Sequence, residues 1–168
     1  PTQVGVNLMA GSMIKNPGGG IALTGGYIAG DKKYVDMVQN RITAPSIGGE
    51  VGSYAYGYQN LYQGLFLAPH TVCQALKGSL VFGQVLTDLG YETSPNMNKM
   101  PNDITRSIKF NDKDKLIKFI QNIQANSPID SFVEVLPWEM PGYEDEVIMA
   151  AGCFVQGSSI ELSADAPI

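Results

Sequence analysis

The stretch that decides the fold is Gly11-Ser12-Met13-Ile14-Lys15-Asn16-Pro17-Gly18-Gly19-Gly20. It follows an apolar, strand-like run that contains Val4, Val6 and Leu8, and a second glycine-rich stretch, residues 25–30, comes soon after. A serine near the end of a strand, a lysine three residues later and a Pro-Gly turn would place one amine and several backbone N–H groups at the end of a sheet. A lysine enclosed in that position would lose solvation, so that its neutral, nucleophilic form becomes more accessible near pH 7.

Lysine amines condense with aldehydes, and the aldehyde cofactor that uses such a lysine is pyridoxal 5'-phosphate. Ser12, Gly18 and Gly19 are then candidate ligands of the cofactor's phosphate, because a hydroxyl and exposed backbone N–H groups bind anions. A plain structural interpretation stays open, since Pro-Gly-Gly-Gly is first of all a turn signal. Other phosphate motifs fit worse: the chain has no G-x-x-x-x-G-K-[ST], and no clean G-x-G-x-x-G opens a helix here.

Ser12, Lys15 and the pair Gly18-Gly19 resemble the cofactor-lysine segment of the cystathionine beta-lyase and methionine gamma-lyase group. Longer blocks resemble one branch of it, the cystathionine beta-lyase-like proteins often called aluminium resistance proteins. These blocks are residues 10–20, 24–30, 41–45, 62–70, 137–143 and 156–165. The resemblance runs over essentially the whole chain. One departure is Ile14, where the better-known lyases have a threonine, so Ser12 and backbone amides must carry more of the phosphate contact.

The resemblance implies an α/β fold of the aspartate-aminotransferase type (fold type I) for a pyridoxal-phosphate enzyme. Residues 1–68 would end the large cofactor-binding domain, 69–90 would form a connecting helix, and 91–168 would form a small, incomplete C-terminal α+β domain. The chain would then be a fragment of a longer enzyme. Its missing N-terminal part would supply the carboxylate that pairs with the pyridinium nitrogen, and the arginine for the substrate carboxylate has no assigned position. The family also implies a homo-oligomer, a dimer or a homotetramer, with the tyrosine-rich segment 54–62 as a candidate contact.

The function that the resemblance implies is that of a lyase that cleaves a carbon–sulfur bond in a sulfur amino acid. Lys15 would hold the cofactor as a Schiff base and, once the substrate displaces it, move protons at the substrate's alpha carbon and leaving group. Two alternatives stay open. One is another reaction of the same cofactor, such as transamination, and the other is a non-catalytic fragment.

Composition excludes several other classes. A net charge of −5 with no basic stripe argues against nucleic acid as a partner. No apolar run approaches the ~18 residues of a membrane span. The lone His70 and the widely separated Cys73 and Cys153 do not make a metal site. Two buried free thiols, as we expect here, suit a reducing cytoplasmic location.

Hydrophobic periodicity predicts a helix over 31–42, a helix over 69–89 that is apolar nearly all round and hence buried, and a helix that begins near Asp112 and ends at Ser127. Residues 91–101 read as a polar linker. Strands are predicted over residues 4–10, 104–110, 131–135, 147–154 and 159–163. Mixed strands and one amphipathic helix in the C-terminal part are typical of an α+β layer.

Overall fold

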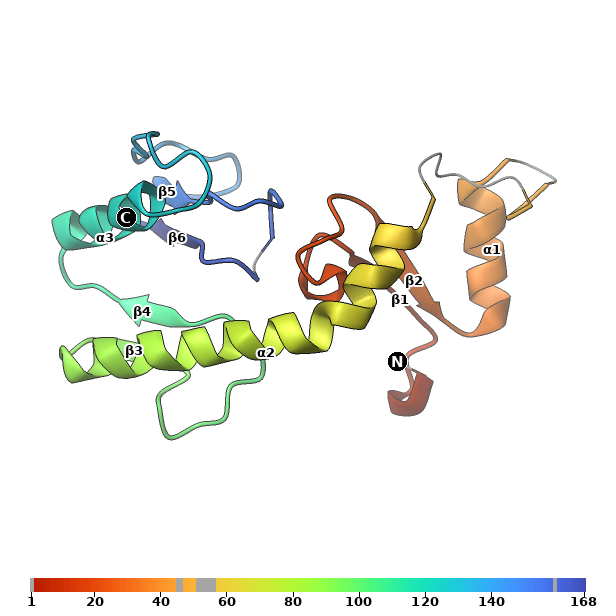
Figure 1. Cartoon of the computed structure of the whole chain (residues 1–168), viewed down its shortest axis with the longest axis horizontal. Helices are drawn as coiled ribbons and strands as arrows, with labels where there is room; N and C mark the ends of the chain where they lie inside the picture. Colours follow the sequence, from red (N-terminus) through yellow and green to blue (C-terminus); the bar gives the residue numbers. More distant parts are fainter. Residues whose placement is uncertain (1, 45–46, 51–56, 159) are drawn as a thin grey trace.

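The computed structural model describes residues 2–44, 47–50, 57–158 and 160–168. It is a mixed α/β structure in which the long helix α2 (Gln59–Asp88) joins two groups of elements (Figure 1). The N-terminal group comprises η1 (Thr2–Val4), β1 (Leu8–Ser12), η2 (Asn16–Gly18), β2 (Gly26–Gly30) and α1 (Lys32–Ile42). The C-terminal group comprises β3 (Glu92–Ser94), β4 (Ser107–Lys109), α3 (Lys113–Ala125), β5 (Val147–Ala150) and β6 (Ala164–Pro167).

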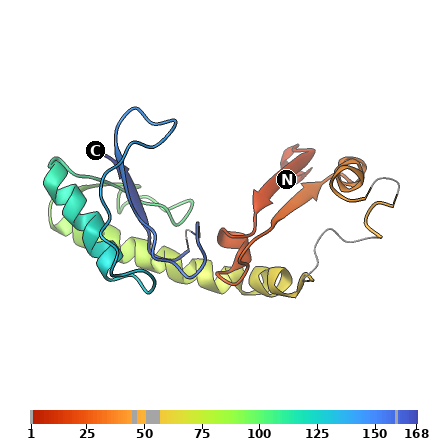
Figure 2. The same ribbon diagram turned by 90° about the horizontal axis from the view of Figure 1, so that it is seen from above.

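The strands β1 and β2 form an antiparallel pair in which Leu8 lies opposite Gly30 and Ser12 lies opposite Gly26. This pair leads away from α2 towards α1 (Figure 2). The strand predicted over residues 4–10 is shifted, because a 3-10 turn precedes it. The helix predicted over 31–42 is confirmed, although the Asp31 carboxylate accepts a hydrogen bond from Asn7 Nδ2 (2.9 Å) and caps no helix N–H.

Helix α2 begins at Gln59, so the predicted start at Pro69 is wrong. Pro69 and His70 lie inside the helix, which bends in its N-terminal half (Figure 1). Proline is common in the first turn of helices, which is why it suggested a start. Inside a longer helix, proline removes one backbone hydrogen bond and is accommodated by a bend.

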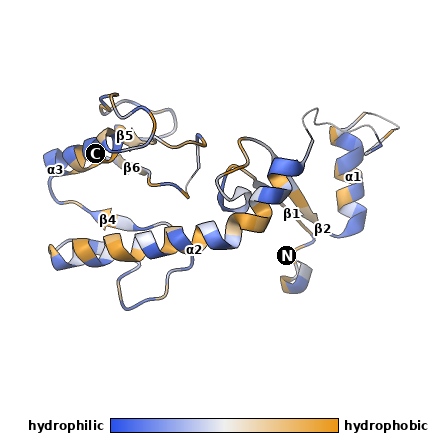
Figure 3. Ribbon diagram, viewed as in Figure 1, coloured by the Kyte–Doolittle hydropathy of each residue, from blue (hydrophilic) through white to orange (hydrophobic). Residues whose placement is uncertain are grey.

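The prediction that this helix is buried is also wrong for the described part of the chain. Phe66 is 84% exposed, Val81 63% and Val85 52%. The hydropathic colouring shows apolar residues along much of α2 (Figure 3). The helix packs on η2 near one end and on β3 near the other, and these contacts bury few of its apolar side chains. Cys73, which was predicted to be buried, is an exposed free thiol on this helix.

The C-terminal group has its own small core. Ile120 of α3 packs against Ile148 and Ala150 of β5, and all three are buried. The helix predicted from Asp112 is confirmed: Asp112 is its N-cap and accepts a hydrogen bond from Lys115 N at 3.1 Å. Partly buried apolar residues surround this core: Leu116, Ile117, Phe119, Ile123, Val135, Ala164, Ala166 and Ile168.

Strand positions in this group were predicted less well. Residues 131–135 form no strand, and β6 covers Ala164–Pro167 where residues 159–163 were predicted. The predicted linker contains β3, which pairs antiparallel with β4 so that Thr93 lies opposite Ile108. In the tyrosine-rich segment, Tyr54 and Tyr56 lie outside the described residues, and Tyr62 is 71% exposed in the first turn of α2. A subunit contact through that segment stays a prediction.

The packing of α2 on η2 leads to a first prediction. A Cβ on Gly64 would overlap the Gly18 carbonyl oxygen, whereas a Cβ on Gly78 of the same helix would meet no atom within 4 Å. We expect Gly64→Ala to lower the free energy of unfolding by about 1–3 kcal/mol, the cost of overpacking. The matched control, Gly78→Ala, should be neutral or stabilise by up to about 1 kcal/mol, because alanine favours helix. Urea unfolding of the longer protein measures both, and equal effects would contradict this packing.

Candidate active site

Lys15 lies on a tight turn that β1 and α2 hold in place. The turn begins where β1 ends, and the Met13 N–H donates a hydrogen bond to the Gly25 carbonyl at 2.9 Å. The Met13 side chain is buried, whereas the Lys15 side chain is exposed immediately before η2. The backbone of the turn is thus anchored while the amine is accessible, so the expectation of an enclosed, poorly solvated lysine is wrong for the described residues.

Ser12 lies three residues before the lysine and is half-buried. Its hydroxyl oxygen accepts a hydrogen bond from the Ile14 N–H at 3.2 Å. A hydroxyl that accepts one bond still has its own proton to donate. Ser12 thus keeps a donor that a phosphate oxygen or another acceptor can use.

Gly18 and Gly19 form the contact between the lysine turn and α2. A Cβ on Gly18 would overlap the Met13 carbonyl, and a Cβ on Gly19 would overlap the Gly64 carbonyl. Their N–H groups donate within the turn, Gly18 to the Lys15 carbonyl at 2.9 Å and Gly19 to the Asn16 carbonyl at 3.1 Å. The structure thus gives these glycines a packing role, and a direct contact with a cofactor stays a prediction.

Sequence reasoning missed the acceptor for the lysine amine. Lys15 Nζ donates a hydrogen bond to the carbonyl oxygen of Gly157, which belongs to the C-terminal group. A Cβ on Gly157 would lie 3.2 Å from Ile14 Cδ1, so the two segments also pack side by side. The only sequence signal was that residues 156–165 form one of the blocks carrying the family resemblance.

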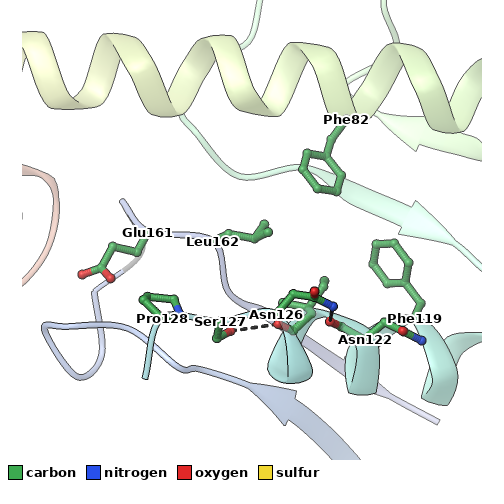
Figure 4. Close-up of a pocket in the computed structure, with 9 residues that line it drawn as sticks. Phe82, Phe119, Asn122, Asn126, Ser127, Pro128, Glu161 and Leu162 are labelled. Carbon is green, nitrogen blue, oxygen red and sulfur yellow. Dashed lines mark hydrogen bonds between the residues drawn. The ribbon is translucent and has the colours of Figure 1, made fainter. Parts of the chain in front are cut away.

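A cleft of about 490 Å³ lies between α2 and the C-terminal group. Phe82 of α2 and Phe119 of α3 line its opposite sides, and Glu161 and Leu162 lie along it (Figure 4). None of the predicted site residues lines this cleft. The candidate site is therefore defined by the lysine turn and Gly157, and the cleft lies apart from it.

Two other classes of site find no support in the part of the chain that the structure describes. Among those residues there is no group of three or more His, Cys, Asp or Glu side chains placed to hold a metal ion. No helix among them is both long enough and apolar enough to cross a bilayer.

Comparison with known proteins shows the family through one family model, and it also finds relatives that are similar over the whole chain. The family model for methionine gamma-lyase matches residues 1–168. The uncharacterized protein YnbB of Bacillus subtilis is 52% identical over the whole chain, which covers 40% of that relative. An uncharacterized 33.9 kDa protein of Lactobacillus delbrueckii subsp. bulgaricus is 51% identical, and the chain covers 55% of it.

Solved structures agree closely. One from Listeria monocytogenes, described as a putative cystathionine beta-lyase involved in aluminum resistance, has a TM-score of 0.93 and 49% identity over the whole chain. One from Clostridium novyi, described as a carbon-sulfur lyase involved in aluminum resistance, has a TM-score of 0.89 and 56% identity. The chain covers 42% and 39% of these two proteins. It thus spans about half or less of the length of its relatives.

Cys153 lies on the segment that carries Gly157 and leads to a second prediction. Burial raises the pKa of the Cys153 thiol above its ordinary value of 9.0, and the charge of Glu161 raises it further. A pKa that is higher in the folded than in the unfolded state contributes stability that is complete below pH 9.0 and is lost as the pH rises through the folded value.

We therefore expect the free energy of unfolding to fall less steeply above pH 9 in Cys153→Ala than in the wild-type protein. Urea unfolding at pH 7, 9 and 10 measures the slope. The exposed Cys73 provides the control, because Cys73→Ala should keep the wild-type slope. Identical slopes in all three proteins would refute the assignment.

Proposed function

The chain belongs to the methionine gamma-lyase family, and on that premise we propose that the full-length protein is a pyridoxal-phosphate-dependent carbon–sulfur lyase. Its substrate would be a sulfur-containing amino acid. The observation that carries the proposal is the accessible Lys15 amine on an anchored turn, with the Ser12 hydroxyl on the same turn. The Clostridium novyi relative is described as a carbon-sulfur lyase, which agrees with this reaction type.

The residues present fit the cofactor. An accessible primary amine is the group that attaches an aldehyde, and the Ser12 hydroxyl has a proton free to donate to a phosphate oxygen. The amine's acceptor is the neutral Gly157 carbonyl, and among the described residues no Asp or Glu carboxylate lies within 4.0 Å of it. A hydrogen bond from a lysine to a neutral carbonyl contributes about 1.5–3 kcal/mol net, less than the about 3–5 kcal/mol lost on breaking a buried ion pair, so the amine can leave it more easily than a carboxylate.

Each residue then has a defined task. Lys15 attaches the cofactor through Nζ and, when the amino acid takes its place, moves protons at the alpha carbon and at the departing sulfur. Ser12 holds the phosphate. Gly18 and Gly19 keep the turn packed against α2, which fixes the position of the Lys15 amine relative to the Ser12 hydroxyl. Pyridoxal phosphate itself supplies the electron sink that stabilises negative charge at the alpha carbon.

The wider architecture is part of the proposal. We assign the whole enzyme to the aspartate-aminotransferase-like fold type I, with residues 1–68 ending the large domain and α2 making the connection to a small domain over 91–168. The relatives are longer than this chain. A further part of the polypeptide would complete the cofactor site and pack on the exposed apolar side chains of α2, in a dimer or tetramer.

Lys15 provides the direct test. In the full-length protein, borohydride reduction should fix the cofactor to the peptide that contains Lys15, as mapped by mass spectrometry. Lys15→Ala should abolish release of thiol from cystathionine or methionine. Lys15→Arg should do nearly the same, because a guanidinium stays charged and does not condense with aldehydes. Lys77→Ala, on the exposed surface of α2, is the control and should retain activity.

Cofactor fixed to another lysine would overturn the assignment of Lys15. Formation of a 2-oxo acid without release of thiol would favour transamination instead. A full-length protein that binds no cofactor at all would favour the non-catalytic alternative.

Ser12 gives an independent test. If its hydroxyl donates to the phosphate, Ser12→Ala should weaken cofactor binding by about 1.5–3 kcal/mol, the range for a hydrogen bond to a charged group. Equilibrium titration of the apoprotein with pyridoxal phosphate measures the change. Ser12→Thr keeps the hydroxyl and should recover most of the affinity. An unchanged affinity in Ser12→Ala would remove Ser12 from the site.

A further inference from the structure

Residues 153–158 and 160–162 belong to a loop whose two ends are hydrogen-bonded to each other and which contacts the lysine turn. The residue of this loop that contacts the lysine is Gly157, whose carbonyl accepts the hydrogen bond from Lys15 Nζ. Gly157 has a φ of +76°, in the left-handed region that favours glycine. The direction of that carbonyl therefore depends on how firmly the rest of the loop is held.

Glu161 holds the loop at its base. One carboxylate oxygen, Oε2, accepts a hydrogen bond from the Phe154 N–H at 2.8 Å, and the other, Oε1, accepts one from the Val155 N–H at 3.2 Å. Hydrogen bonds to an ionised carboxylate are roughly twice as strong as neutral ones. Among the described residues, no lysine or arginine nitrogen lies within 4.0 Å of this carboxylate. Its charge is thus directed at two successive backbone N–H groups.

Two hydrogen bonds between neutral groups lie close to Gly157 within the loop. The Ser158 N–H donates to the Val155 carbonyl at 3.0 Å, and the Ile160 N–H donates to Ser158 Oγ at 3.3 Å. Val155 and Ser158 are buried, which fixes both sides of Gly157. Glu161 itself lies at the end of the cleft, with no other drawn side chain against its carboxylate (Figure 4).

We propose that Glu161 is a positioning residue for Lys15, which acts by fixing the loop that presents the Gly157 carbonyl to the lysine amine. The proposal rests on the proposed function, in which the freed amine must stand at the alpha carbon to move protons. Without the carboxylate, Phe154 and Val155 lose their acceptor, the Gly157 carbonyl moves, and the amine samples positions from which it transfers protons poorly.

The test uses the full-length protein and Glu161→Gln. Glutamine keeps one acceptor oxygen but turns an NH₂ group towards a backbone N–H, so one of the two bonds is lost. We expect kcat to fall about tenfold or more, the equivalent of one hydrogen bond to a charged group, with KM changed less than about twofold. Glu134→Gln, an exposed acid in the same group of elements, is the matched control and should change neither parameter.

Two readouts on the apoprotein do not depend on turnover. Hydrogen exchange at the Phe154 and Val155 amides should speed up in Glu161→Gln, since a lost hydrogen bond exposes them. Reductive methylation of Lys15, followed by mass spectrometry, should also speed up, because the amine spends less time bound to Gly157. Gly157→Ala disturbs the carbonyl without touching the carboxylate. It should reproduce the faster labelling and the lower kcat, and it replaces Glu161→Gln if that variant does not fold.

The proposal is wrong if the two amides exchange faster but Lys15 labelling and kcat stay at wild-type values, because the loop then does not position the lysine. It is equally wrong if amide exchange does not change. A rise in KM with unchanged kcat in Glu161→Gln would indicate that Glu161 contacts the substrate, and this result would also overturn the proposal. Failure of the proposed function looks different: the wild-type protein would carry no cofactor on Lys15, while exchange and labelling would still report on the loop.

Discussion

The position of the candidate lysine depends on a close contact of backbone with backbone. Gly18 and Gly19 on the lysine turn meet Gly64 on α2, and a side chain at any of the three would overlap a carbonyl oxygen of the turn or the helix. Thr71 adds a polar contact, because its hydroxyl donates to the Gly19 carbonyl at 3.4 Å. A turn held through its backbone leaves side chains free for other partners. The Lys15 amine and the Ser12 hydroxyl are the reactive and hydrogen-bonding groups among them.

The second support for the lysine comes from the other end of the chain. The hydrogen bond from Lys15 to Gly157 joins residues 142 positions apart. The C-terminal group that carries Gly157 has its own core around Ile120 and Ile148, so its internal packing does not rely on the lysine turn. Helix α2 contacts both groups and sets the distance between them. The candidate site thus depends on the lysine turn, on α2 and on the C-terminal group together.

Local signals in the sequence predicted local structure well. Asp112 marked the start of α3, and the Pro-Gly turn placed Lys15 after a strand. Several of the failures involve partners distant in sequence. Pro69 suggested a helix start, yet α2 already begins before Pro69, and Gly64 in that earlier part of the helix contacts the lysine turn. The pairing of β3 with β4 and the return of Gly157 to Lys15 leave no periodic pattern, so only the family resemblance pointed to that last segment.

The kind of acceptor that faces Lys15 also bears on the chemistry. An amine that must attach a cofactor, release it and then move protons has to leave its resting partner each time. Breaking a buried ion pair costs about 3–5 kcal/mol, whereas a hydrogen bond in which one partner is charged contributes about 1.5–3 kcal/mol net. The backbone carbonyl of Gly157 is a partner of the second kind, and the amine that it faces is exposed. Because this bond is weaker than an ion pair, its direction depends on the surrounding backbone. A charged side chain a few residues away, such as Glu161, can stiffen that backbone without binding the amine itself.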